Sequence, residues 1–223
     1  TGPKDGGAER MGMQSNGKNV RPWTRPGAVE IDSAVPGDAS FTLRFKEVKG
    51  NGLDVEGYRV YWNGSALDSS RVTITRGSDG VVTAVAKGIR NGYKDPALRE
   101  GYPVTVEAYT RDAEHPSIGN DEIKIATGIP PAPVITETEV GTTSFRLAWK
   151  DSAIVSGNKD YTVYIRANNT EVGHYPTKDN VMTIDSSKVT LKEGTPYIVT
   201  VTTKNEIGES AESASVRVVL GSP

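Results

Sequence analysis

Two short stretches, SFTLRFKE at residues 40–47 and SFRLAWKD at residues 144–151, decide the fold class of this chain. In both stretches apolar and polar residues alternate, which is the period-two pattern of a β-strand with one buried face. The second stretch places Phe145, Leu147 and Trp149 on that face. Because the two stretches lie 104 residues apart, they indicate two copies of one β-domain.

Other segments repeat at a similar offset. GYRVYW at residues 57–62 corresponds to DYTVYI at residues 160–165, and LREG at residues 98–101 corresponds to LKEG at residues 191–194. A repeat of about 100 residues is longer than a solenoid unit of roughly 20–50 residues. Many short strands in a unit of this length are typical of a β-sandwich. The sequence therefore predicts an all-β chain with two consecutive seven-stranded β-sandwiches.

The composition agrees with this fold class and excludes several functions. The chain has 24 Val and 13 Ile against 7 Leu, and β-branched side chains favour strands. It has no cysteine, which excludes disulfides, a thiolate zinc site and a thiol nucleophile. The net charge of −2 provides no general attraction to nucleic acid. No stretch approaches the ~18 apolar residues of a membrane span.

The chain divides into three predicted segments: an extended basic arm at residues 1–25, a sandwich at 26–128 and a second sandwich at 129–223. The run GIPPAP at residues 128–133 marks the second boundary, because proline lacks an N–H and cannot continue a central strand. The prolines make this a short and rather stiff link, so we expect the sandwiches to be joined end to end with restricted swing.

The arm has no hydrophobic period and carries a net charge of +3, so alone it is predicted to be disordered. We expect it to fold onto a partner during assembly, although a leader without function is the alternative. Its contact residues would combine apolar anchors with cations: Met11, Met13, Lys18, Arg21, Trp23 and Arg25.

Several residues of the second copy occur in an order that one family shares: Pro131, Pro133, Trp149, Tyr161, LKEGTPY at residues 191–197 and NEIGES at residues 205–210. On these residues the second copy resembles a fibronectin type III domain over its full length. The resemblance implies that Tyr197 is the corner tyrosine, whose hydroxyl bonds back to the backbone upstream.

The first copy departs from this pattern. Phe45 stands where the family has Trp, and Val104 occupies the register of Tyr197. The tyrosine corner is therefore either missing or supplied by Tyr102. We interpret residues 26–128 as a divergent fibronectin type III sandwich or a related immunoglobulin-like sandwich.

The sequence contains few candidate catalytic groups. The two histidines, His115 and His174, are predicted to lie in loops exposed to water, and no metal-ligand or G-x-S-x-G motif is present. We therefore expect no enzyme activity, no catalytic residue, no metal and no cofactor. On the third strands Tyr61 and Tyr164 are predicted to face outward, while Tyr58 and Tyr161 face the core. The outward pair is a candidate platform for carbohydrate or protein, and ordinary cross-strand packing is the favoured alternative.

These features favour a structural or binding protein. The leading hypothesis is a bacteriophage virion protein, made in the host cytoplasm, whose arm binds the capsid or tail lattice. Capsid is preferred because the chain has no tube-forming domain, and the sandwiches would project for decoration or weak adhesion to a host glycan or protein. The alternatives are extracellular: a spacer or binding fragment of a secreted bacterial glycosidase or adhesin, or a fragment of an animal receptor ectodomain.

Overall fold

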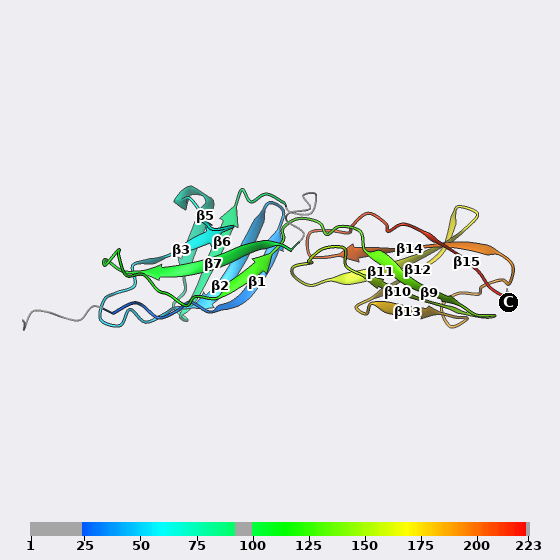
Figure 1. Cartoon of the computed structure of the whole chain (residues 1–223), viewed down its shortest axis with the longest axis horizontal. Helices are drawn as coiled ribbons and strands as arrows, with labels where there is room; N and C mark the ends of the chain where they lie inside the picture. Colours follow the sequence, from blue (N-terminus) through cyan, green and yellow to red (C-terminus); the bar gives the residue numbers. More distant parts are fainter. Residues whose placement is uncertain (1–23, 92–99, 222–223) are drawn as a thin grey trace, which may run out of the picture.

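The computed structural model describes residues 24–91 and 100–221 of the chain. Within these ranges the fold is all-β, with a short 3-10 turn, η3 (Ser69–Arg71). Two sandwiches, each with its own hydrophobic core, lie end to end (Figure 1). The predicted fold class, tandem all-β sandwiches, is confirmed. The predicted arm lies almost wholly outside the described residues.

The first sandwich consists of two four-stranded antiparallel sheets. One sheet has the order β1 (Ile31–Gly37), β2 (Ser40–Lys46), β6 (Val81–Lys87) and β5 (Val72–Arg76). The other has the order β4 (Ser65–Ala66), β3 (Gly57–Trp62), β7 (Tyr102–Tyr109) and β8 (Glu122–Ile125). The described part of this sandwich thus has eight strands instead of seven, because the hairpin after β3 adds the two-residue strand β4.

Alternation along β2 explains the core of the first sandwich. Phe41, Leu43 and Phe45 are buried, whereas Arg44 and Lys46 on the same strand are exposed. Tyr58 on β3 packs edge-on against Phe45, with ring centroids 4.9 Å apart. The predicted inward positions of Phe45 and Tyr58 are therefore confirmed.

The second sandwich has a three-stranded and a four-stranded sheet, which gives the predicted seven strands. The smaller sheet has the order β13 (Val181–Ile184), β10 (Phe145–Lys150) and β9 (Val134–Val140). The larger has the order β12 (Thr170–Thr177), β11 (Asp160–Ala167), β14 (Pro196–Lys204) and β15 (Val216–Val219). Phe145, Leu147, Trp149 and Tyr161 are buried between the sheets, as predicted.

The corner tyrosine of the second sandwich is at the expected place. The Tyr197 side chain is buried, and its hydroxyl accepts a hydrogen bond of 2.7 Å from the backbone N–H of Lys192, five residues upstream. In the first sandwich Tyr102 is fully buried, and its hydroxyl accepts a bond of 3.3 Å from Arg90. Residues 92–99, where an equivalent upstream bond would end, lie outside the described residues.

Replacing Tyr197 with Phe is expected to destabilise the second sandwich by about 1–3 kcal/mol, because the Lys192 N–H loses its acceptor while the ring stays in place. Urea unfolding of the full chain measures this loss. The matched control is Tyr175→Phe, which removes a hydroxyl bonded to the carbonyl of Lys188 on the exposed surface. If both substitutions changed stability equally, the corner would have no special role.

Candidate functional site

The two histidines lie far apart in the fold and each pairs with one acid. Nδ1 of His115 lies 2.8 Å from Asp112, and Nδ1 of His174 lies 2.8 Å from Glu171. The prediction that both histidines lie in exposed loops was wrong in detail. His115 is half-buried in its loop, and His174 belongs to strand β12.

Within the described ranges no group of three or more His, Cys, Asp or Glu residues is arranged to hold a metal ion. The same ranges contain no helix with the length and apolar character needed to cross a bilayer.

Five predicted contact residues of the arm, Met11, Met13, Lys18, Arg21 and Trp23, lie outside the described residues. The sixth, Arg25, is half-buried against the first sandwich. Its guanidinium donates a hydrogen bond of 2.7 Å to the carbonyl of Pro116, and its own carbonyl accepts one of 2.9 Å from the Asn51 side chain. Arg25 therefore contacts its own chain, and its role in partner binding stays a prediction.

Tyr61, one half of the predicted aromatic platform, lies on the outer face of β3. Its hydroxyl donates a hydrogen bond of 3.3 Å to Glu107 on β7. The same carboxylate forms an ion pair of 2.8 Å with Arg59, which faces it directly across the two strands. The tyrosine is half-buried. Its hydroxyl belongs to a cross-strand polar cluster with Glu107 and Arg59.

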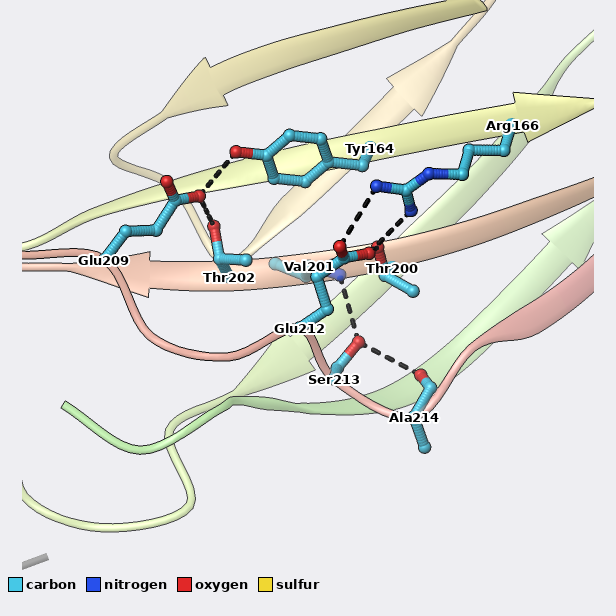
Figure 2. A network of polar contacts seen from close by, with 9 residues as sticks. All are labelled: Tyr164, Arg166, Thr200, Val201, Thr202, Glu209, Glu212, Ser213 and Ala214. Carbon is cyan, nitrogen blue, oxygen red and sulfur yellow. Dashed lines mark hydrogen bonds and ion pairs between the residues drawn. The ribbon is translucent and has the colours of Figure 1, made fainter. Parts of the chain in front are cut away.

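Tyr164 occupies the corresponding place on β11 of the second sandwich, and its surroundings form a larger network (Figure 2). The Tyr164 hydroxyl donates a hydrogen bond of 2.5 Å to Glu209. Thr202 on β14 donates to the same oxygen over 2.5 Å. Glu209 follows the end of β14, so a loop returns over the sheet to place an acid above it.

A second acid of this loop completes the network. Glu212 accepts two hydrogen bonds from the Arg166 guanidinium, of 2.6 and 3.0 Å, and another from the Thr200 hydroxyl (Figure 2). The neighbouring Ser213 hydroxyl accepts from the backbone N–H of Val201. The loop after β14 is thus bonded to the sheet in two ways. The carboxylates of Glu209 and Glu212 bond to side chains of the sheet, and the Ser213 hydroxyl bonds to its backbone.

The faces of the Tyr164 ring have close neighbours. The Arg166 guanidinium carbon lies 5.7 Å from the ring centroid, and the His174 ring lies 5.7 Å away at a tilt of 34°. A cation and an aromatic ring at these distances are ordinary stabilising contacts on a sheet surface. The geometry supports the packing interpretation, and ligand binding by Tyr61 and Tyr164 stays a prediction.

Sequence reasoning missed most of this network. Thr200 and Thr202 could have been placed outward by alternation, because they flank the inward Val201. Glu209 and Glu212 lie in a loop without a period, so the sequence contains no signal that they return to β11.

The network shifts the ionisation of its members. The hydrogen bond to the Glu209 carboxylate, followed by burial, raises the pKa of Tyr164 to about 12. Hydrogen bonds from Thr202 and then Tyr164 lower the pKa of Glu209 below its ordinary value. A tyrosine whose pKa is higher in the folded state contributes stability below its unfolded pKa of about 10, and that contribution is lost as the pH rises toward 12.

The stability of the second sandwich is therefore expected to fall between about pH 10 and pH 12, and Tyr164→Phe is expected to weaken that fall. Part of the fall will remain, because burial also raises the pKa of Tyr161. Thermal denaturation followed by circular dichroism over this pH range tests the expectation. The control is Tyr61→Phe in the first sandwich; if Tyr164→Phe altered the profile no more than this control, the assigned shift would be refuted.

The family model described as Fibronectin type III domain matches residues 130–219. A comparison with curated proteins finds no match. Many solved structures are similar to this chain, and three of them, all with low sequence identity, illustrate the likeness. The FN1-FN3 domains of chicken CNTN1 are 13% identical, with 89% of this chain and 67% of that chain covered and a TM-score of 0.42.

Domains A168-A170 of titin are 16% identical, with 86% of this chain and 61% of that chain covered and a TM-score of 0.36. A structure described as a myokine is 20% identical. The match covers 41% of this chain and 97% of that chain, with a TM-score of 0.34.

Proposed function

We propose that this chain is a non-enzymatic spacer that projects a binding or decorating surface from a larger assembly. The observation that carries the proposal is the arrangement of two sandwiches in series, each with its own closed core. The match to the fibronectin type III model over residues 130–219 indicates a structural or binding module. Such a series separates what is attached at one end from what is presented at the other.

The setting we propose is the surface of a bacteriophage particle, with the arm at residues 1–25 bound to the capsid lattice. A basic segment with Met and Trp anchors suits ordering on a protein surface. A chain without cysteine suits production in a reducing cytoplasm. Many copies on a symmetric lattice would convert weak contacts of the outer sandwiches with a host surface into useful avidity.

Removing residues 1–25 is expected to reduce association with purified particles by at least about tenfold, the equivalent of ~1.4 kcal/mol. Trp23→Ala is expected to act in the same direction, because aromatic anchors dominate interface energies. Co-sedimentation with particles measures both. Thermal unfolding of Trp23→Ala should match the intact chain, whereas the truncated chain also lacks the Arg25 hydrogen bonds with Pro116 and Asn51 and is expected to lose some stability.

The matched control is Trp62→Phe, an aromatic substitution within the first sandwich that leaves the arm intact. Undiminished co-sedimentation after removal of the arm would contradict the proposed attachment. If Trp23→Ala weakened attachment and sandwich stability alike, Trp23 would belong to the first core.

A further inference from the structure

The segment that joins the sandwiches is bonded to both of them. Gly128, at the start of the linker, donates its N–H to the carbonyl of Gly37 in the first sandwich over 3.0 Å. Its carbonyl accepts a hydrogen bond of 3.0 Å from the Asn205 side chain of the second sandwich. Gly128 has a φ of +91°, a conformation that glycine adopts readily. One peptide group on each side of this residue is therefore fixed by a different sandwich.

Asn205 is itself held firmly. The residue is 5% exposed. Its side-chain oxygen Oδ1 accepts hydrogen bonds from the backbone N–H groups of Ile207 and Gly208, at 2.9 and 3.2 Å. Its own backbone N–H donates to the carbonyl of Gly208. Because these bonds fix the side-chain oxygen, they also fix the orientation of the side-chain amide. Its nitrogen Nδ2 therefore points toward the carbonyl of Gly128.

A second loop of the second sandwich makes an independent link. The Ser156 hydroxyl accepts a hydrogen bond of 2.9 Å from the backbone N–H of Ala126, a fully buried residue just after β8. Next to it Gly157 has a φ of +84°, and a Cβ added there would lie 2.9 Å from Cδ of Pro36 on β1. A side chain at this position would therefore have to displace both the Glu206 carboxylate of the second sandwich and Pro36 of the first.

The same loop is tied to the turn that carries Asn205. The Glu206 carboxylate accepts hydrogen bonds of 3.2 and 3.1 Å from the backbone N–H of Asn158. The two links to the first sandwich, through Asn205 and through Ser156, therefore come from loops that are joined to each other. Rotation about the linker would have to break both links together.

We infer that Gly128, Ser156, Gly157 and Asn205 form a locking junction that holds the two sandwiches at one fixed angle. The inference deepens the proposed spacer function: a locked junction makes the pair a single strut with a defined reach. Proline in the adjoining linker contributes by fixing φ near −65°. With a free hinge the outer sandwich would instead sample many positions.

The test uses the absence of cysteine, because two introduced thiols can be spin-labelled without background. Thr75→Cys on β5 and Thr183→Cys on β13 place labels on exposed positions of the two sandwiches. Pulsed electron spin resonance then measures the distance distribution between them. The locked junction predicts one narrow distribution, and Ser156→Ala with Asn205→Ala is expected to increase its width roughly twofold or more.

Gly157→Val is expected to shift the mean distance, because the new side chain must displace Pro36 and the Glu206 carboxylate that holds Asn158. The matched control is Ser186→Ala with Thr190→Ala, at exposed positions outside the junction, and it should leave the distribution unchanged. Urea unfolding confirms that each labelled variant is folded. The labelled parent needs no junction variant to be informative: a distribution as broad as that of a chain with a glycine-serine linker would overturn the inference. Particle association, measured separately, would be unaffected by that outcome.

Discussion

Replacing Trp149 with Ala is expected to destabilise the second sandwich by about 3–5 kcal/mol, the usual cost of removing a large buried aromatic side chain. The side chain is 3% exposed and packs edge-on against Tyr161, with ring centroids 5.7 Å apart. Its indole N–H has no hydrogen-bond partner among the described residues. The expected loss is therefore one of packing and cavity formation, with no polar contribution.

Hydrogen exchange read by mass spectrometry separates this effect by sandwich, because peptides from residues 134–219 and from residues 31–125 are distinct. In Trp149→Ala, hydrogen exchange should accelerate only in the peptides from residues 134–219. Trp149→Phe should lose much less, since Phe45 fills the corresponding position in the other copy. Lys150→Ala, at the next and exposed position, should change stability by no more than about 0.5 kcal/mol. Unchanged protection in Trp149→Ala would disprove the core position of Trp149.

Phe45→Ala is expected to cause a similar loss, about 3–5 kcal/mol, confined to the first sandwich. Phe45 is fully buried and contacts Tyr58 edge-on. The Tyr58 hydroxyl is anchored by donating a hydrogen bond of 2.5 Å to Glu47, so the ring cannot easily move to fill the space. The cavity left behind therefore remains largely open, and this is the condition under which truncation costs most.

The same exchange experiment measures this variant, with Lys46→Ala as the exposed neighbour control. Acceleration in both sandwiches would mean that they share one cooperative unit. Combining Phe45→Ala with Trp149→Ala should give additive losses, because the two sites belong to separate cores.

The parts of the fold that depend on local alternation could be predicted from the sequence. The inward positions of Phe45, Tyr58, Trp149 and Tyr161 follow from period-two spacing, and the corner bond of Tyr197 followed from the family resemblance. Neither required knowledge of how distant segments meet.

The parts that depend on tertiary contacts could not be predicted. The return of Glu209 and Glu212 onto β11 is made by a loop without a period. The junction likewise depends on Asn205 and Gly128, which are 77 residues apart in sequence. The place of His174 on a strand was not predicted for a related reason. Strand β12 is an edge strand whose residues are half-buried or exposed, so its hydrophobic alternation is weak.

We propose that the chain is a spacer attached to a particle by residues 1–25. Electron cryomicroscopy of particles made with the intact chain, without the chain, and with a chain lacking residues 1–25 tests it most directly. We expect rod-shaped density long enough for two sandwiches in the first sample only. Particles that look the same in all three samples would contradict it.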